Sequence, residues 1–409
     1  MSSPVDGLNY HQNLFADRQE IIDLVCGSVG QLRRGPPLDQ RVVRCYGVTG
    51  SGKSWLLCHL QQIIVDEYRG VLALRLCLVR DPTRLVVNPA TYLGSPPADA
   101  QIIIIELLRW LIERVIAARG VTPEWVNVTD DPQRLGERLN KEIATTGKPL
   151  VLLVDGLDEH PQDVIQAVEQ YCLLPLLQRR DVLLILAVRL PPSYVHPWSR
   201  ELVFRSQDLM LTPFSPPDVQ DQLEKAADAG LSPPINAAQA QEIILRGGGY
   251  PLNNFSLARA LDPHSGTWTT PGETFRSEAD RLLAPVDARL RPAFEALCVL
   301  RQFDEHRMDE LFRAYGVSAS PPIAPTDLTR TRLAVWDDQA KAYVMDEALR
   351  RLLENALYFG DSNRWRKLHK AARDLYRDWG SRYPGTASRW HAEMAFHEKC
   401  VVAGRPLPL

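Results

Sequence analysis

The stretch Val42-Val-Arg-Cys-Tyr-Gly47-Val-Thr-Gly-Ser-Gly-Lys53-Ser54 decides the fold predicted for this chain. It begins as a strand-like run, passes through a glycine-rich turn and enters a helical pattern that continues to Glu67. In that context the glycines let the backbone curl so that successive N–H groups point at one anion, and the helix N-terminus adds a favourable dipole. The stretch therefore predicts a phosphate-binding loop between a strand and a helix.

The residues of this loop have distinct predicted tasks toward a nucleotide. Lys53 is expected to bridge the β- and γ-phosphates, and the Ser54 hydroxyl to bind Mg²⁺. The guanine-reading pattern Asn-Lys-x-Asp does not occur, since the nearest stretch, Asn140-Lys141-Glu-Ile143, lacks the final acid. The predicted cofactors are therefore ATP or ADP with Mg²⁺. The candidate nucleotide-binding residues are Gly47, Thr49, Gly50, Ser51, Gly52, Lys53, Ser54 and Trp55.

A second apolar run, Lys148-Pro-Leu-Val-Leu-Leu-Val-Asp155, ends in a carboxylate, and we expect it to lie beside the phosphate-loop strand. Asp155 is the predicted metal residue, because a carboxylate there can hold a magnesium-bound water. Asp158 and Glu159 follow, and either can orient or deprotonate the attacking water. The sequence does not choose between them. The structural alternative is a solvated turn in which Asp158 caps a helix.

An arginine ends a further strand pattern, Val182 to Val188. At that position Arg189 would face the γ-phosphate and report its presence through charge-assisted hydrogen bonds. The alternative is a solvated arginine before Pro191-Pro192.

The first two hundred residues alternate strand and helix patterns, which predicts a doubly wound α/β domain with a parallel sheet. Beyond Pro213 the pattern becomes helical, and a hairpin signal then precedes a helix, which favours a helical lid and a winged helix. The predicted strands are Val42 to Tyr46, Val71 to Val79, Leu150 to Val154, Val182 to Val188 and Leu202 to Phe204. The predicted domains are a tail (1–14), the nucleotide-binding domain (15–215), the lid (216–262), a linker (263–274), the winged helix (275–360) and a repeat-like helical segment (361–409).

Composition indicates a protein of the cytoplasm. The formal net charge of -3 gives no global attraction to nucleic acid or anionic lipid. Seven scattered cysteines are typical of buried, reduced thiols rather than of a disulfide framework. The N-terminus lacks a signal peptide pattern. The most apolar run, Ile102 to Ile116, carries several charges and predicts a buried helix, so we expect no membrane partner.

The order of these motifs resembles the STAND class of P-loop ATPases, which includes the NACHT and NB-ARC proteins, over about residues 12 to 375. The phosphate loop and Arg189 contribute to the resemblance. Three further stretches carry it: Phe15-Ala-Asp-Arg18-Gln-Glu20, Val151-Leu-Leu-Val-Asp-Gly-Leu-Asp-Glu159 and Gly249-Tyr-Pro251-Leu252. The last is similar to the Gly-x-Pro motif that packs against adenine, so Pro251 joins the candidate nucleotide-binding residues. Taken alone, the same stretch is a helix stop and turn.

The resemblance implies a molecular switch that hydrolyses ATP slowly. It implies a closed ADP state, with the winged helix packed on the nucleotide, and an ATP state that opens and self-associates. Partner proteins would supply the sensor or effector, as in bacterial signalling or defence. In many members a histidine at the start of the last winged-helix helix contacts the ADP phosphate, but here that stretch reads Tyr343-Val-Met345-Asp346-Glu347. The contact with ADP would then be weaker, or made by another residue such as Arg350.

Two other functions remain open. A DNA-binding ATPase, either a transcription regulator or an initiator-like protein, is favoured by the basic helix Arg364 to Arg377. The apolar spacing of that helix favours a packed amphipathic helix with a solvated basic face instead. A nucleic acid partner is therefore the less favoured alternative, and a small-molecule kinase would leave the helical half without a purpose.

Overall fold

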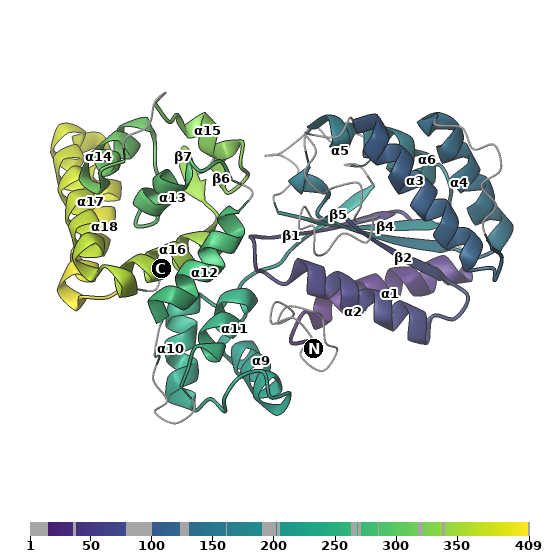
Figure 1. The fold of residues 1–409 in the computed structure, drawn as a ribbon, viewed down its shortest axis with the longest axis horizontal. Helices are drawn as coiled ribbons and strands as arrows, with labels where there is room; N and C mark the ends of the chain where they lie inside the picture. The colour runs from purple at the N-terminus through teal and green to yellow at the C-terminus, as the bar shows by residue number, and fades with distance from the viewer. Residues whose placement is uncertain are drawn as a thin grey trace. The chain divides into compact units, whose positions relative to one another are not determined.

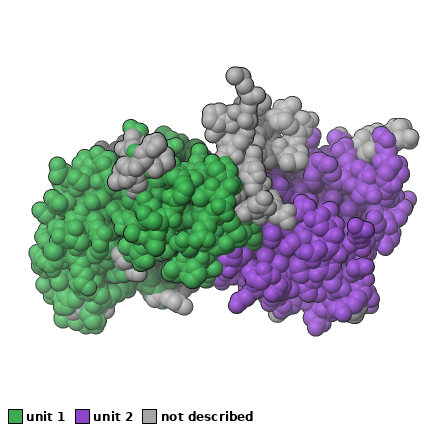
Figure 2. Space-filling model, turned by 90° about the horizontal axis from the view of Figure 1, so that it is seen from below, with its two compact units in different colours: residues 1–16, 48–52, 212–409 green, residues 17–47, 53–211 purple. Residues whose placement is uncertain are grey.

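The computed structural model describes residues 15–35, 38–78, 100–122, 131–160, 162–189, 202, 205–262, 268, 271–284, 286–317, 322–337 and 340–407. The chain divides into two compact units, coloured separately in Figure 2. Unit 1 contains residues 1–16, 48–52 and 212–409, and unit 2 contains residues 17–47 and 53–211. The centre of the phosphate loop is therefore grouped with the C-terminal half of the chain.

Unit 2 is built on a five-stranded sheet of order β2-β3-β4-β1-β5, in which every neighbouring pair is parallel. Helices α1 and α2 cover one face, and α3, α4 and α6 cover the other (Figure 1). This is the predicted doubly wound α/β fold. The strands are β1 Val42–Tyr46, β2 Leu72–Cys77, β3 Leu150–Asp155, β4 Val182–Val188 and β5 Ser206–Met210. The helices are α1 Gln19–Arg34, α2 Lys53–Glu67, α3 Ala100–Ala117, α4 Pro132–Thr146, α5 Gln162–Val168 and α6 Leu174–Leu177.

Burial explains the sequences of β3 and β4, two of the three inner strands. Every residue of β3 and of β4 is buried, because helices cover both faces of a parallel sheet and leave no solvent-facing side. Both strands therefore read as continuous apolar runs rather than as alternating patterns. Such runs are recognisable in a sequence, and the predicted bounds of both strands agree with the structure to within one residue.

The prediction that the acidic strand lies beside the phosphate-loop strand is wrong. The acidic strand β3 pairs with β2 and β4, and β4 lies between β3 and β1. In register, Asp155 faces Ala187 of β4, which in turn faces Cys45 of β1. Sequence spacing cannot decide this order, because both apolar strands are long and hydrophobic enough to occupy the centre of the sheet.

The predicted fifth strand, 202–204, is wrong at its described residue, because Leu202 is a buried helical residue, whereas 203 and 204 lie outside the described residues. The strand of this region, β5, is Ser206–Met210. β5 is an edge strand with half-buried and exposed positions, so its polar sequence gave a weak signal. An ion pair between a buried arginine and an exposed aspartate holds it to β1. The Arg44 guanidinium, 2% exposed, donates to both carboxylate oxygens of Asp208 at 2.7 and 3.0 Å, which compensates the cost of burying its charge.

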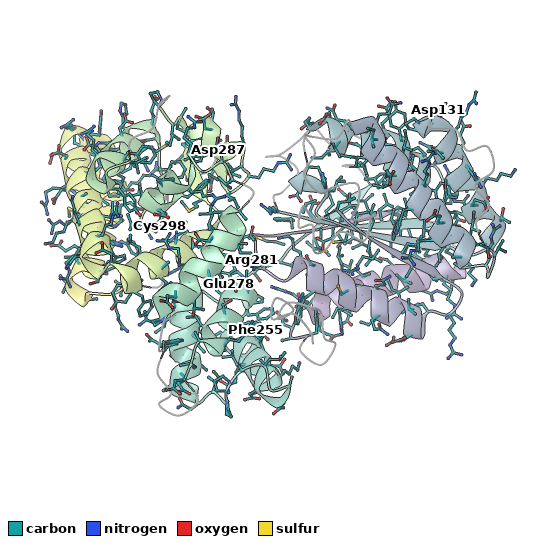
Figure 3. The ribbon with its side chains drawn as sticks, in the orientation of Figure 1. Asp131, Phe255, Glu278, Arg281, Asp287 and Cys298 are labelled. Atoms are coloured by element: carbon teal, nitrogen blue, oxygen red, sulfur yellow. The ribbon has the colours of Figure 1, made fainter. Side chains whose placement is uncertain are left out.

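The apolar run predicted as a buried helix is α3, with one face packed in the core of unit 2. Within the part of the chain that the structure describes, no helix is both long and apolar enough to cross a membrane. The N-cap of the next helix, α4, is Asp131, which is labelled in Figure 3 and whose carboxylate accepts the Gln133 N–H at 3.0 Å. All seven cysteines carry free thiols.

Unit 1 is mainly helical, with one small hairpin (Figure 1). Its elements are α9 Pro216–Asp228, α10 Ala237–Gly247, α11 Pro251–Arg259, α12 Pro271–Leu283, α13 Arg291–Leu297, α14 Glu305–Tyr315, α15 Pro325–Thr329, β6 Ala334–Asp337, β7 Ala342–Met345, α16 Glu347–Gly360, α17 Ser362–Arg382 and α18 Ala387–Ala403. The predicted lid helices correspond to α9 and α10.

The winged helix consists of α13, α14, α15 and the antiparallel pair β6–β7. Phe303 forms an isolated antiparallel bridge to the hairpin, because its N–H and carbonyl exchange hydrogen bonds with Tyr343 at 2.8 and 2.9 Å. Helix α16 follows the hairpin, and its Arg350 donates to the carbonyl of Cys298, labelled in Figure 3, at 3.1 Å. The predicted hairpin is confirmed.

Helices α16, α17 and α18 enclose a polar cluster in the core of unit 1. Arg350 donates to Glu354 at 3.0 Å, Glu354 lies 3.3 Å from His369, and His369 shares a 2.9 Å hydrogen bond with His397. All four side chains are buried. Burial, together with His369, Arg301 and Arg350, holds the pKa of His397 well below its ordinary value. His397 is therefore neutral in the folded protein.

This cluster predicts a loss of stability in mild acid. In the unfolded chain, His397 binds a proton with an ordinary pKa of about 6.5. In the folded protein it does not bind this proton, because its pKa is lowered. The unfolding free energy should therefore fall as pH drops below about 6.5, by up to about 1.4 kcal/mol per pH unit. Urea unfolding between pH 7 and pH 5 measures this slope. His397→Gln should flatten it whatever its own stability, and exposed His391→Gln on the same helix should not; equal slopes in all three proteins would contradict the assignment.

Candidate functional site

The loop after β1 has the conformation that its glycines permit. Gly50 and Gly52 have φ angles of 79° and 93°, in the left-handed region that side chains disfavour. Helix α2 begins at Lys53, so Ser54 and Trp55 lie in its first turn. Strand, glycine-rich loop and helix follow one another as the sequence predicts, and together they form the core of a P-loop NTPase domain.

Both ends of the loop are fixed within unit 2. The Gly47 N–H donates to the carbonyl of Val188 at 3.3 Å, and the Lys53 ammonium donates to the carbonyl of Gly47 at 2.6 Å. Because Arg189 directly follows Val188, the first residue of the loop lies beside the end of β4. The lysine is thus held at the mouth of its own loop, where the β- and γ-phosphates would lie.

Asp155 lies at the same carboxyl edge of the sheet. It is the last residue of β3, and its side chain is buried, with the residue 4% exposed. One strand separates it from β1, so the backbones of β3 and β1 are about 10 Å apart at twice the usual strand spacing. Asp155 and Arg189 therefore lie at the ends of two neighbouring strands, and Gly47 and Lys53 belong to the loop beside them. Parallel sheets bind ligands at these strand ends.

Asp158 has a structural task that the sequence did not reveal. It lies within the 3-10 helix Leu157–Glu159, is 3% exposed, and accepts the Arg189 N–H at 2.6 Å. It is not the cap of an α-helix, as the structural alternative assumed, but it ties the end of β3 to the end of β4. Glu159 ends the same turn, and its side chain lies outside the described residues.

This tie predicts different effects of two substitutions. Asp158→Ala removes the acceptor of the Arg189 N–H, a part-buried backbone donor, and should lower the unfolding free energy by about 1–3 kcal/mol. Asp158→Asn keeps a carbonyl oxygen for Arg189 and should cost much less. Thermal and urea unfolding of both variants check the difference, and equal losses would show that the charge, rather than the hydrogen bond, matters.

The residues at this edge fit Mg²⁺ and a nucleotide by their chemistry. A serine hydroxyl and a buried carboxylate are oxygen ligands of the kind Mg²⁺ prefers, with phosphates and water supplying the rest. Among the described residues, no group of three or more His, Cys, Asp or Glu side chains is arranged to hold a metal ion alone. Ser54 and Asp155 would therefore hold the ion together with the phosphates.

The central residues of the loop make their contacts in unit 1. The Thr49 N–H donates to the Asp346 carboxylate at 2.8 Å, and the Leu252 N–H donates to the Gly50 carbonyl at 3.2 Å. A Cβ on Gly50 would lie 2.8 Å from the Cβ of Leu252, so only glycine fits there. Ser51 is fully buried. These contacts join the loop to the first turn of α11 and to the N-cap of α16.

The Gly-x-Pro stretch forms the start of α11. Gly248 ends α10, Tyr250 precedes α11, and Pro251 is its first residue, so the stretch is a helix stop and restart. Pro251 also lies against the loop, since a Cβ on Gly52 would be 3.8 Å from its Cγ. Sequence reasoning missed Leu252 as a loop contact, for which no signal existed, and noted Asp346 only as a departure from a family pattern.

Several solved structures align with most of this chain. Orc1 of Aeropyrum pernix, solved in complex with DNA, has 14% identity and a TM-score of 0.45, covering 86% of this chain and 95% of that chain. Cdc6p of Pyrobaculum aerophilum has 13% identity and a TM-score of 0.44, covering 86% and 98%. The RuvB Holliday junction branch migration motor of Thermotoga maritima has 14% and 0.39, covering 82% and 96%. No protein-family model and no curated protein matches the chain.

Proposed function

We propose that this protein is an ATP- and ADP-binding switch that hydrolyses ATP slowly in the presence of Mg²⁺. The observation that carries the proposal is the common edge of the sheet in unit 2, where Gly47, bonded to Lys53, lies beside the end of β4 and the end of β3 follows on the far side of β4. Backbone N–H groups and a lysine there suit phosphates, and Asp155 with Ser54 suits the metal ion.

Each residue of the edge has a proposed role. Lys53 neutralises the β- and γ-phosphates, and Arg189 contacts the γ-phosphate from the end of β4. Asp158 positions Arg189 through its backbone N–H. Glu159 is then the better candidate for the base that orients the attacking water, because Asp158 is buried and already bound. Trp55 and Pro251 flank the loop and are proposed to contact the nucleotide.

Removal of the lysine tests nucleotide binding. Lys53→Ala should lose most affinity for ATP and ADP, since the principal cation facing the phosphates disappears. The nucleotide released by heat from freshly purified protein measures this, with exposed Lys141→Ala on α4 as the matched control. Unchanged binding by Lys53→Ala would contradict the proposed function.

Amide substitutions show which of the two acids after β3 is the catalytic base. Glu159→Gln should retain ATP binding and slow hydrolysis by at least about 100-fold, as expected for loss of a catalytic base. Asp158→Asn should hydrolyse ATP at a rate close to that of the unchanged protein. Phosphate release at saturating Mg·ATP measures both rates, and the reverse result would assign the base to Asp158.

We further propose that the switch is of the STAND type. Its support is the order of the motifs and the contacts that the loop makes with α11 and with the N-cap of α16 in unit 1. ATP binding would then open the protein and promote self-association, with sensor or effector supplied by partner proteins in a signalling or defence response. Nucleotide-dependent mass measured by light scattering tests the assembly, which should require ATP.

A DNA-binding ATPase is the second candidate. In its favour, Arg366, Lys367 and Lys370 are exposed on one helix, α17. Against it, Arg373 and Arg377 on the same helix both pair with Asp374. The short helix α15, which precedes the hairpin, has five residues and carries an acid, Asp327. Helix α15 therefore offers little surface for reading a groove.

Salt dependence separates the two candidates. We expect binding to duplex DNA to be weak, independent of sequence and lost between about 50 and 200 mM salt, as for purely electrostatic contacts. Titration of labelled duplexes with the unchanged protein and with an Arg366, Lys367 and Lys370 triple glutamine variant measures this. Tight, sequence-selective binding at the higher salt would favour the DNA-binding function.

A further inference from the structure

The phosphate loop is hydrogen-bonded to a carboxylate of the protein itself. Within unit 1, the Asp346 carboxylate accepts the Thr49 N–H at 2.8 Å. Loops of this kind bind phosphate because their N–H groups point toward one negative charge. In this structure, one N–H group of the loop, that of Thr49, is satisfied by a side chain that follows the winged-helix hairpin.

Asp346 is held firmly in this position. Its N–H donates to the carbonyl of Leu333 at 2.7 Å, and its carbonyl accepts the Arg350 N–H at 2.9 Å. One carboxylate oxygen accepts the Leu349 N–H at 3.1 Å, which caps α16, and the other oxygen accepts the Thr49 N–H. The two oxygens thus have separate tasks, one inside the winged helix and one on the loop.

The nearby cations are bound to other acids. Arg350 donates to Glu347 at 2.7 and 2.8 Å and to Glu354 at 3.0 Å, and Arg351 donates to Glu347 at 2.9 Å. Among the described residues, Asp346 takes part in no ion pair. Within the described residues its negative charge is therefore not neutralised by an ion pair.

A second contact keeps the loop against this carboxylate. The Leu252 N–H, in the first turn of α11, donates to the Gly50 carbonyl at 3.2 Å. The loop is thus held through one N–H group and, at the next residue, through one carbonyl. The first contact matters for phosphate binding, because a carboxylate and a phosphate seek the same N–H groups and repel each other.

We propose that Asp346 is an internal competitor for the phosphate loop, and that it disfavours triphosphates more than diphosphates. The proposal rests on the proposed nucleotide-binding function and assigns the regulation of that site. The γ-phosphate adds charge to the ligand, so ATP is repelled more strongly than ADP by a fixed carboxylate on the same loop. Binding of ATP is then coupled to separation of Asp346 from Thr49, which frees the loop from the winged helix.

One isosteric substitution tests the contact. Asp346→Asn keeps an oxygen that caps α16, as asparagine is an equally good N-cap. It replaces the oxygen facing Thr49 with an NH₂ group, which cannot accept a hydrogen bond. Asp361→Asn is the matched control, because Asp361 caps α17 through the Arg364 N–H at 2.9 Å and lies away from the loop in sequence and in its hydrogen bonds.

Two measurements read the effect independently. In nucleotide-free protein, hydrogen exchange in peptides covering residues 48–52 should be about tenfold faster in Asp346→Asn than in the unchanged protein or the control. By calorimetry, Asp346→Asn should bind Mg·ATP about tenfold more tightly, equal to about 1.4 kcal/mol. The gain for ADP should be smaller.

The outcomes are distinct. Unchanged exchange would show that the carboxylate does not hold the loop, and this would overturn the proposal. Weaker ATP binding by Asp346→Asn would mean that Asp346 supports nucleotide binding. Equal ATP affinities of the variant and the unchanged protein would mean that Asp346 does not compete. Either result overturns this proposal but leaves the proposed function standing. Absence of nucleotide binding in every protein, including the unchanged one, would instead overturn the proposed function and the competition with it.

Discussion

The backbone N–H groups of the glycine-rich loop are the constraint on which the rest of this structure depends. A loop that curls around an anion leaves several donors facing one point, and such donors need an acceptor. At the strand ends, the loop is anchored by Gly47 and Lys53 within unit 2. At its centre, Thr49 finds its acceptor in Asp346. The loop therefore has one set of donors and two kinds of acceptor, a carboxylate of its own chain and the phosphates of a nucleotide.

The sheet supports this loop by bringing strand ends together. Parallel strands end at the same edge, so residues far apart in the sequence meet where the helices begin. β4 occupies the place between the loop strand and the acidic strand, and it contributes Arg189 at its end. Asp158 fixes that arginine by accepting its N–H. One buried carboxylate thus serves the geometry of the edge, which leaves Asp155 and Glu159 for the metal ion and the water in the proposed mechanism.

Unit 1 shows a second use of buried charge. Arg350 and Glu354 are fully buried, and each is bonded to a partner on α16 or an adjacent helix. Burial alone would raise the pKa of Glu354, but His369, Arg350 and Arg351 lower it, so the carboxylate stays ionised. Removal of one partner from such a cluster lowers the free energy of unfolding, because it leaves a charge unpaired in the core. The cluster therefore fixes the packing of α17 and α18 on α16, whose N-cap is Asp346.

The sequence by itself determined the phosphate loop, the apolar strands β1, β3 and β4, most helices and the hairpin of the winged helix. These features depend on local patterns: glycine spacing, apolar runs and periodic helical faces. It missed α1, α11, α12 and α15, although α1 has buried apolar residues at helical spacing, and the predicted linker 263–274 overlaps the start of α12. It also misplaced β5, whose polar residues are held by Arg44. Strand order, the tie between Asp158 and Arg189, and the bond between Asp346 and Thr49 were decided by the tertiary structure alone. Each joins residues distant in the chain, and no local pattern records which buried donor will meet which acceptor.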